Sequence, residues 1–331
     1  MQVTYEAHPN YEQIATFHDD DFHCIVAIHS TRLGPAFGGC RLKPYLTHAD
    51  AMVDVLRLAK AMTYKCSLAD LNFGGGKMVV IADHPTRDIL LKIGEVLNQF
   101  AGSFITGEDI GTTPDDIAVV NEVTPYVARI DGSAMTARGV LSAMLAAALY
   151  HKEWGDSLDG VAIWVQGLGK VGMPLTYMLS QHDHPNIYVS DLRTDLVSQA
   201  CSLPGVYSLT ENDKKFISIY APCAMGQVVH PGNVHTLRHS IICGAANNQL
   251  LDDSYAEVLY KNDVLYVPDW LANAGGVIVG ACEADGPYDK TRAETMTDDI
   301  GQRLIRVLEM ADKEGIPPLH AAKRLAEVRL L

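Results

Sequence analysis

Two lysines stand close together in the sequence and are candidates for acid–base chemistry. Lys65 ends the segment at residues 62–65, and 12 residues later Lys77 follows the three glycines at residues 74–76. Because glycine lets a backbone approach a ligand closely, we expect a turn here that delivers Lys77 beside Lys65 in a cleft. Each ammonium group would disfavour the charge of the other, and a lysine of lowered pKa suits a general base. For either lysine alone, a solvated surface group is the more ordinary interpretation.

A second glycine pattern is typical of dinucleotide binding. Its six residues, which follow the apolar run at residues 161–166, are Gly167, Leu168, Gly169, Lys170, Val171 and Gly172. The first glycine permits a tight turn, the second lets the backbone approach a pyrophosphate, and the third lets helix and strand pack closely. Asp191, 19 residues after Gly172, would accept from the ribose hydroxyls and repel a 2′-phosphate. The pattern therefore favours NAD over NADP, although Arg193 leaves this preference open.

The elements that would position the lysines form a mixed pattern in the first third of the chain. A strand is expected at residues 22–29, followed by a turn rich in glycine and proline. Apolar residues at helical spacing predict helices at residues 49–64 and 89–100. Thr47 with Asp50, and Thr113 with Asp116, are typical of capping boxes, so a further helix is expected to begin at Pro114.

From about residue 135 the pattern changes to strands that alternate with helices, which is typical of a parallel sheet with crossover helices. Strands are expected at residues 161–166, 187–190, 216–220, 240–243 and 264–267. Apolar residues from Met296 to Ala311 predict an amphipathic helix near the end of the chain. We therefore expect an α/β fold of two domains, with a cleft between them that binds a small ligand.

Composition excludes several classes of protein. The chain has 331 residues, 48% hydrophobic and 20% charged, so it can bury a core and is not disordered by composition. Its net charge of −14 disfavours binding to nucleic acid or to an anionic membrane surface. Seven scattered cysteines without a C-x-x-C pair indicate reduced thiols in a cytoplasm. The N-terminus lacks a secretion signal and the uncharged stretches are too short to cross a bilayer, so small molecules are the expected partners.

Several further segments join the loop at Gly167 as distinctive motifs: residues 34–41, 62–65, 74–77, 106–112, 221–224, 244–248 and 272–276. Together these segments resemble the glutamate, leucine, phenylalanine and valine dehydrogenase family, and most of all its leucine, phenylalanine and tryptophan dehydrogenase branch. They occur in the family's order and cover roughly residues 30–285.

The resemblance implies a domain organisation. Residues 1–133 would form an α/β domain with a mixed sheet that binds substrate and makes most subunit contacts. Residues 134–304 would form a Rossmann NAD-binding domain, and residues 305–331 would pack back on the first domain. The protein would be a homo-oligomer, a dimer or an octamer.

The resemblance also implies a role for each matching residue. Lys77 would be the catalytic base, Asp109 would handle the substrate amine and share protons with Lys77, and Lys65 would bind the α-carboxylate. Asn273 would help to hold the carboxylate, and no metal would be needed. The remaining substrate-binding residues would be Phe37, Gly38, Gly39, Gly107, Val277 and Gly280. Besides the glycine loop and Asp191, the cofactor would contact Thr136, Ala221 and Asn247.

The implied reaction is NAD-dependent oxidative deamination of an L-amino acid to the 2-oxo acid and ammonia. Glutamate is disfavoured, because Phe37 stands where glutamate-specific relatives commonly carry a lysine, and a phenyl ring cannot neutralise a buried carboxylate. Glycine at both 107 and 280 would widen the pocket, which favours phenylalanine or tryptophan; leucine or valine is the alternative. The large Phe37 ring could partly refill that space.

Two other classes of function stay open. A noncatalytic NAD-binding regulatory protein would not need Lys65, Lys77 and Asp109 together. A dehydrogenase of hydroxy acids would usually need a histidine paired with an acid, and an arginine for the carboxylate.

Overall fold

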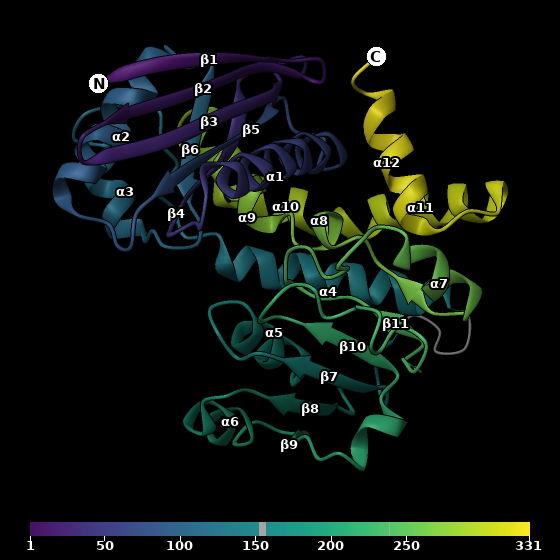
Figure 1. Cartoon of the computed structure of the whole chain (residues 1–331). Helices are drawn as coiled ribbons and strands as arrows, with labels where there is room; N and C mark the ends of the chain where they lie inside the picture. The colour runs from purple at the N-terminus through teal and green to yellow at the C-terminus, as the bar shows by residue number, and fades with distance from the viewer. Residues whose placement is uncertain (152–156, 238) are drawn as a thin grey trace. The chain divides into compact units, whose positions relative to one another are not determined.

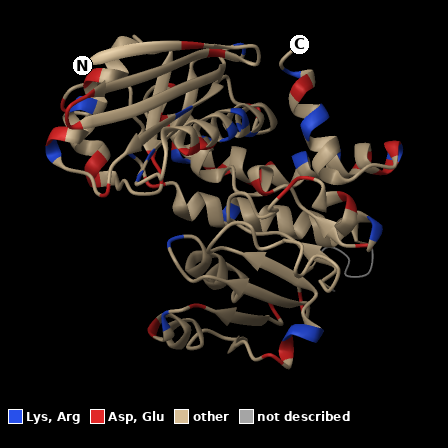
Figure 2. Ribbon diagram, viewed as in Figure 1, with Lys and Arg blue, Asp and Glu red and all other residues tan. Residues whose placement is uncertain are grey.

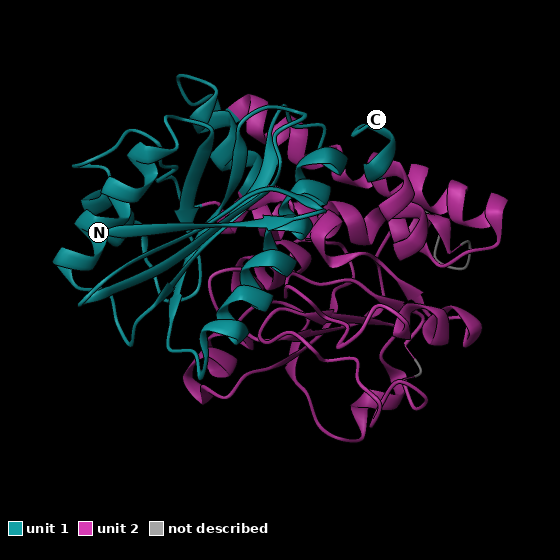
Figure 3. Cartoon of the chain, turned by 45° about the horizontal axis from the view of Figure 1, so that its top comes forward, with its two compact units in different colours: residues 1–131, 277–290, 326–331 teal, residues 132–276, 291–325 magenta. Residues whose placement is uncertain are grey.

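The computed structural model describes residues 1–151, 157–237 and 239–331. The chain forms two compact units, which Figure 3 colours separately. Unit 1 comprises Met1–Asp131, Val277–Lys290 and Ala326–Leu331, and unit 2 comprises Gly132–Gly276 and Thr291–Leu325. Two six-stranded sheets combine with helices, so the predicted α/β class is confirmed.

The sheet of unit 1 is mixed. Its strands are β1 (Gln2–His8), β2 (Tyr11–Asp19), β3 (Phe22–Ser30), β4 (Ala36–Lys43), β5 (Gly74–Ile81) and β6 (Phe104–Glu108). They lie in the order β1-β2-β3-β5-β4-β6 (Figure 1). The pairs from β1 to β3 and from β3 to β5 are antiparallel, whereas β4 runs parallel to both β5 and β6. The mixed sheet expected in the first domain is therefore confirmed.

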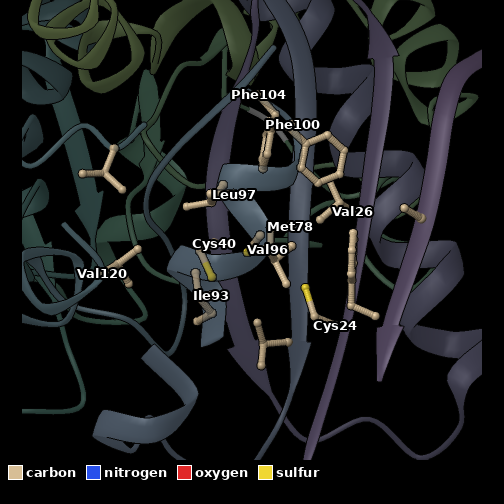
Figure 4. Close-up of a cluster of buried hydrophobic side chains, with 14 of the residues drawn as sticks. Cys24, Val26, Cys40, Met78, Ile93, Val96, Leu97, Phe100, Phe104 and Val120 are labelled. Atoms are coloured by element: carbon tan, nitrogen blue, oxygen red, sulfur yellow. The ribbon is translucent and has the colours of Figure 1, made fainter. Parts of the chain in front are cut away.

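Helices cover both faces of this sheet: α1 (His48–Leu68), α2 (Arg87–Gln99) and α3 (Pro114–Val120). Met78 and Val80 of β5 pack in one apolar cluster with residues of α2 and α3 (Figure 4), whereas Val79 packs in another with residues of α1. Since neighbouring strand residues point to opposite faces, α1 covers one face and the other two helices cover the other. The capping boxes predicted at Thr47 and Thr113 are both present.

The glycines at residues 74–76 do not form the expected turn. They begin strand β5, and the segment that we expected to turn after residue 29 contains strand β4. A methyl group on Gly75 would overlap the backbone of Thr63 in α1, and one on Gly76 would lie 2.9 Å from the Phe104 ring. Glycine at these positions therefore lets neighbouring elements approach the strand closely, rather than reversing the chain.

The sheet of unit 2 is entirely parallel. Its strands are β7 (Ala162–Gln166), β8 (Asn186–Ser190), β9 (Val206–Ser208), β10 (Ile219–Pro222), β11 (Ile241–Ile242) and β12 (Leu265–Tyr266). They lie in the order β12-β11-β10-β7-β8-β9, which is the Rossmann order with β7 as the first strand. These strands carry no charged residue (Figure 2), as is typical of parallel strands covered on both faces.

One of the predicted strands of unit 2 is misplaced. The strand expected at residues 216–220 begins only at Ile219, because Asp213–Phe216 forms a short 3-10 helix, η1. The other four predicted strands overlap β7, β8, β11 and β12.

The helices within unit 2 are α4 (Ser133–Tyr150), α5 (Gly172–Leu179), α6 (Thr194–Ala200), α7 (Tyr255–Lys261), α8 (Asp269–Ala272) and α11 (Ile300–Glu314). Three more, α9 (Gly275–Ala284), α10 (Lys290–Asp298) and α12 (Pro318–Val328), contain the positions at which the chain passes from one unit to the other. Among the helices in the described ranges, α4 alone is long and apolar enough to span a membrane, and it packs against α5 and α11.

The C-terminal region differs from the expectation in two ways. The apolar stripe predicted from residue 296 to 311 falls on two helices, because the helical backbone is interrupted at Asp299, between α10 and α11. Of residues 305–331, which we expected on the first domain, only residues 326–331 belong to unit 1. The physical reason is the apolar face of α11, including the buried Leu304 and Val307, which packs against α4 inside unit 2.

Candidate active site

Two buried cations and a half-buried carboxylate meet on the face of the unit 1 sheet that α1 covers. Lys77 lies in the middle of β5, and Asp109 directly follows β6. The Nζ atom of Lys77 is 2.9 Å from Oδ2 of Asp109, and Nε of Arg41, from β4, is 2.8 Å from the same oxygen. The exposed fractions of the three side chains are 6%, 16% and 8%, so these charges compensate one another largely out of water.

The turn that carries Asp109 is fixed to strand β4. The backbone N–H of Asp109 donates to Oγ1 of Thr112 at 3.0 Å, and that hydroxyl lies 2.9 Å from the carbonyl oxygen of Cys40, to which it donates. Gly39 leaves room for the ion pair, because a methyl group there would lie 2.8 Å from Cβ of Asp109 and 3.1 Å from Nζ of Lys77. Gly39 therefore lies beside the candidate catalytic residues Lys77 and Asp109.

The two cations determine the charge of Asp109. Burial alone would raise the pKa of its carboxyl, but Lys77 and Arg41 lower that pKa well below its usual range. The neighbouring Cys40 behaves differently, since burial raises the pKa of its thiol to about 12. Asp109 is therefore an anion at neutral pH, and Cys40 is a neutral packing residue.

Arg41 is a residue of this cluster that the site prediction missed. Its NH1 atom is 3.0 Å from Oδ2 of Asp54 in α1, and the Tyr45 hydroxyl donates to the same carboxylate oxygen at 2.6 Å. The available signal was strand alternation, because Gly39 and Arg41 are two residues apart on β4 and so point to one face.

Lys65 lies in the last turn of α1 and is buried, with an exposed fraction of 8%. Gly75 faces Thr63 of α1, and Lys77, two residues along the same strand, points to this same side. Two residues close to Lys65 in α1 contact the end of the chain: the Tyr64 hydroxyl donates to Oε1 of Glu327 at 2.8 Å, and Oγ of Ser67 donates to the carbonyl of Ala326 at 2.7 Å.

The Phe37 ring lies over one of the two glycines that were expected to widen the substrate pocket. A methyl group on Gly280 would lie only 2.5 Å from Cζ of Phe37, so the phenyl ring already fills the space over this glycine. Ala128, which the site prediction missed, lies between the two glycines: its oxygen would be 3.3 Å from a Cβ on Gly107, and its Cβ 3.3 Å from one on Gly280. Val277, on α9 like Gly280, is half-buried. Gly38 of β4 packs against Gly76 of β5.

The glycine loop of unit 2 follows β7, as predicted, and leads into α5. Gly167 has a φ of +95°, and a methyl group on it would meet Cβ of Ala224 at 2.6 Å. Nothing lies within 4 Å of a Cβ placed on Gly169, and both Gly169 and Lys170 are exposed. The loop therefore presents open backbone at its middle glycine, whereas the side chain of Leu168 is buried.

Asp191 follows β8 and contacts the loop. Its Oδ2 accepts from the backbone N–H of Leu168 at 2.6 Å, and its Oδ1 accepts from that of Arg193 at 2.8 Å. These two hydrogen bonds lower the pKa of the Asp191 carboxyl. The guanidinium of Arg193 pairs with Asp195 at 2.6 Å.

Asn273 is buried in unit 2, with an unusual hydrogen-bond pattern. Its Nδ2 donates to the carbonyl of Ala245 at 3.0 Å and to Oδ1 of the exposed Asn247 at 2.8 Å, so both amide hydrogens are used. Its Oδ1 is buried and has no hydrogen-bond partner within the described part of the chain. In the structure, Asn273 therefore offers an acceptor rather than the donor that a carboxylate clamp needs.

The other two predicted cofactor-binding residues also belong to unit 2. Ala221 is fully buried in β10. Thr136 is half-buried in the first turn of α4, where its hydroxyl donates to the carbonyl of Gly132 at 3.0 Å.

Comparison with known proteins identifies two segments of the chain that match one enzyme family. Residues 12–126 match the model of the Glu/Leu/Phe/Val dehydrogenase dimerisation domain, and residues 205–330 match that of glutamate/leucine/phenylalanine/valine dehydrogenase. The chain belongs to this family. It is 36% identical to phenylalanine dehydrogenase of Caldalkalibacillus thermarum over 99% of this chain and 93% of that protein. It is 38% identical to leucine dehydrogenase of Bacillus subtilis over 97% and 92% of the two chains.

A solved structure is also similar. The crystal structure of L-tryptophan dehydrogenase from Nostoc punctiforme matches with a TM-score of 0.86 and 37% identity, covering 97% of this chain and 95% of that one. The protein is thus an amino-acid dehydrogenase, an oxidoreductase of the Glu/Leu/Phe/Val family.

Within this amino-acid dehydrogenase, the predicted residues fall into two groups. Unit 1 contains the ion pair of Lys77 and Asp109, with Lys65 and all the candidate pocket residues except Asn273. Unit 2 contains Asn273 and every candidate cofactor residue. In the ranges that the structure describes, no group of three or more His, Cys, Asp or Glu side chains could hold a metal ion.

Proposed function

We propose that the protein catalyses the reversible, NAD-dependent oxidative deamination of an L-amino acid with a bulky apolar side chain, giving the 2-oxo acid and ammonia. The observation that carries this proposal is the buried contact of 2.9 Å between Lys77 and Asp109 beside Gly39. A lysine and a carboxylate in one shielded place can exchange a proton and bind an amine, which are the two acid–base tasks of the reaction.

The residues of unit 1 then act on separate groups of the substrate. Lys65 binds the α-carboxylate, and Asp109 accepts from the amine, so that Cα is held in one orientation. Asn273 of unit 2 is the second candidate for the carboxylate end, although Oδ1, its amide atom without a hydrogen-bond partner in the described chain, is an acceptor. After hydride leaves Cα, Lys77 in its neutral form takes a proton from water, which attacks the iminium carbon. Lys77 returns this proton to the nitrogen of the carbinolamine and takes up the hydroxyl proton, so that the C–N bond breaks, ammonia leaves and the carbonyl of the 2-oxo acid forms.

The residues of unit 2 fit a dinucleotide. The open space over Gly169 allows a pyrophosphate to approach the loop, and Asp191 stands at the end of β8 where ribose hydroxyls would lie. Although both Asp191 oxygens accept backbone N–H groups, each keeps a lone pair for a hydroxyl. When bound, NAD supplies the acceptor for the hydride. Asn247 and Thr136 are the candidates near its nicotinamide end, and Ala221 is a further candidate for cofactor contact.

NAD is preferred over NADP in this proposal. The Asp191 carboxylate would repel a 2′-phosphate, and the hydrogen bonds from Leu168 and Arg193 keep it ionised. Arg193, the residue that could bind such a phosphate, already pairs with Asp195.

The substrate is an apolar amino acid. Phe37, Ala128, Gly107 and Gly280 are all uncharged. A pocket that they line could not compensate the distal carboxylate of glutamate, so glutamate is disfavoured. The absence of a side chain at Gly107 favours phenylalanine or tryptophan. The Phe37 ring over Gly280 is the specific observation that keeps leucine or valine as the alternative, because it removes part of the space.

The active form is a homo-oligomer, a dimer or an octamer, and works in the cytoplasm. Strand β1 supports the proposal that a second copy of the chain binds at this edge, because β1 is an edge strand of seven residues, six of them exposed. An edge strand exposed in this way offers unpaired backbone groups. The seven free cysteines suit a reducing compartment.

The test is formation of NADH from NAD with each L-amino acid in turn, repeated with NADP and with a hydroxy-acid panel. We expect phenylalanine or tryptophan to give the highest kcat/KM, and Lys77→Met to lower kcat about 100-fold or more. Lys60→Met, which removes an exposed lysine of α1, is the matched control. NAD binding without any turnover would instead support a noncatalytic regulatory protein.

A further inference from the structure

Arg41 and Lys77 converge on one oxygen of Asp109. Nε of Arg41 lies 2.8 Å, and Nζ of Lys77 lies 2.9 Å, from Oδ2. Within residues 1–151, 157–237 and 239–331, no hydrogen bond reaches Oδ1 of this carboxylate. A carboxylate held by one oxygen cannot rotate freely, so its other oxygen keeps a fixed direction.

We propose that Arg41 is a positioning residue that holds Asp109 by Oδ2, leaves Oδ1 for the substrate amine, and keeps the carboxylate ionised while Lys77 is neutral. This inference rests on the proposed function, because it assigns Arg41 a task in that reaction. The side-chain partners of Arg41 in the described part of unit 1 are Asp109 and Asp54, so Arg41 acts through Asp109.

The position of Arg41 is fixed from behind. NH1 of Arg41 contacts Asp54 of α1 at 3.0 Å, and Tyr45 donates to the same oxygen of Asp54 at 2.6 Å. Lys43 lies 3.9 Å from that oxygen, at the more exposed end of the cluster. The side chain of Arg41 is 8% exposed, so its guanidinium has little freedom to leave Asp109. A planar guanidinium can bridge two carboxylates in this way, whereas a lysine ammonium cannot do so with the same geometry.

The need for a second cation follows from the chemistry of Lys77. Lys77 must be neutral when it takes a proton from water, and at that moment it no longer compensates the charge of Asp109. A buried carboxylate without a compensating cation tends to take up a proton, and a protonated Asp109 could not accept from a substrate amine at that oxygen. Arg41 stays charged throughout, because its guanidinium does not lose its proton in proteins.

The ionisable groups that face this carboxylate come from several elements. They are Lys77 of β5, Arg41 and Cys40 of β4, and, behind Arg41, Asp54 of α1 with Tyr45 and Lys43. Cys40 is neutral, and Asp54 compensates Arg41 without contacting Asp109 in any hydrogen bond or ion pair of the described chain. Arg41 and Lys77 are therefore the two groups that set the charge state of Asp109.

The experiment compares Arg41→Gln, Arg41→Lys and the wild type, with Arg87→Gln as the matched control. Arg87 also pairs with a carboxylate, that of Glu122, but on the exposed surface of unit 1. We expect Arg41→Gln to lower kcat about 10-fold or more and to move the acidic limb of the kcat/KM profile upward by about one pH unit. Arg41→Lys should restore part of the pH shift but less of kcat, because it restores charge without the bridge to Asp54.

A second measurement does not depend on activity. Infrared difference spectra, with Asp109→Asn as the reference, report the protonation midpoint of the Asp109 carboxyl in Lys77→Met and in Lys77→Met/Arg41→Gln. Lys77→Met imitates the neutral lysine, so we expect a clearly higher midpoint in the double variant. Equal midpoints, or an unchanged pH profile and kcat in folded Arg41→Gln, would overturn the proposal.

The outcomes separate this inference from the proposed function. If the wild type oxidises no amino acid, the proposed function fails, and the role of Arg41 toward an amine fails with it. If the wild type is active and Arg41→Gln melts like the control but keeps its full kcat and pH profile, only the role of Arg41 fails. Thermal unfolding of every variant identifies losses that come from misfolding.

Discussion

Gly39 and Lys77 lie on neighbouring strands so close together that a methyl group on Gly39 would come within 3.1 Å of Nζ of Lys77. The same methyl group would lie 2.7 Å from the carbonyl oxygen of Glu108. The contact between Lys77 and Asp109 therefore depends on the absence of a side chain at residue 39.

Replacing this glycine tests that dependence. We expect Gly39→Ala to lower kcat about 10-fold or more, because a displacement of 1 Å at reacting groups can have a large effect on rate. Overpacking should also lower the free energy of unfolding by about 1–3 kcal/mol. Steady-state kinetics and urea unfolding measure the two effects. A fully active Gly39→Ala would contradict the geometry given for the ion pair.

Phe37 and Gly280 form a second dependent pair. Gly280→Ala places a methyl group 2.5 Å from the Phe37 ring, and we expect it to lower the free energy of unfolding by about 1–3 kcal/mol. Phe37→Leu removes the ring atom concerned, so the double variant should recover part of this loss. Urea unfolding of the four proteins gives the coupling energy. Simple additivity would mean that the two side chains do not share this space.

The same variants test the pocket. If the Phe37 ring limits its size, Phe37→Leu should raise the ratio of kcat/KM for phenylalanine to that for leucine. Gly280→Ala in the Phe37→Leu background should reverse part of that change. An unchanged ratio would place the substrate side chain elsewhere.

The lowered pKa of His29 predicts that the stability of the protein depends on pH. Its Nδ1 is 2.9 Å from Oγ1 of Thr63, and burial, with a contribution from Lys60, lowers its pKa to about 4. Between pH 4 and an unfolded value of about 6.5, the unfolded chain binds more protons, so stability falls as the pH falls through this window.

Replacing His29 with glutamine should flatten this dependence by an amount on the order of 1 kcal/mol. Urea unfolding at several pH values measures it, with the exposed His84→Gln as control. Some slope should remain, because burial also lowers the pKa of His23 and of His239. A slope equal to that of the wild type would show that His29 is not the group responsible.

The end of the chain should influence substrate binding through Lys65. Glu327→Gln combined with Ser67→Ala removes contacts on both sides of Lys65, and we expect a severalfold higher KM for the amino acid with a smaller change in kcat. Arg324→Gln is a matched control, because Arg324 lies on α12 like Glu327 but pairs with Glu314 of α11. An equal effect of the control would indicate general destabilisation of the helix.

Local signals in the sequence were sufficient for part of the fold. The capping boxes at Thr47 and Thr113 depend only on residues three positions apart, and both occur as predicted. The alternation of strands and helices after residue 135 likewise predicted the parallel sheet and placed the glycine loop after β7. Strands β4 and β5 were not predicted, because their glycines indicated turns. These glycines instead make room for Thr63, Phe104 and Gly76, which are distant in sequence or on a neighbouring strand.

The sequence by itself determined the α/β class, the family and the identity of the candidate lysines, since short motifs and periodic patterns carry that information along the chain. Only the tertiary structure decided that Arg41 and Lys77 meet at one oxygen of Asp109, and that the Phe37 ring fills the space over Gly280. Both relationships join residues from separate elements. Their distances depend on how strands pair and helices pack, and the spacing of residues along a chain does not encode these distances locally.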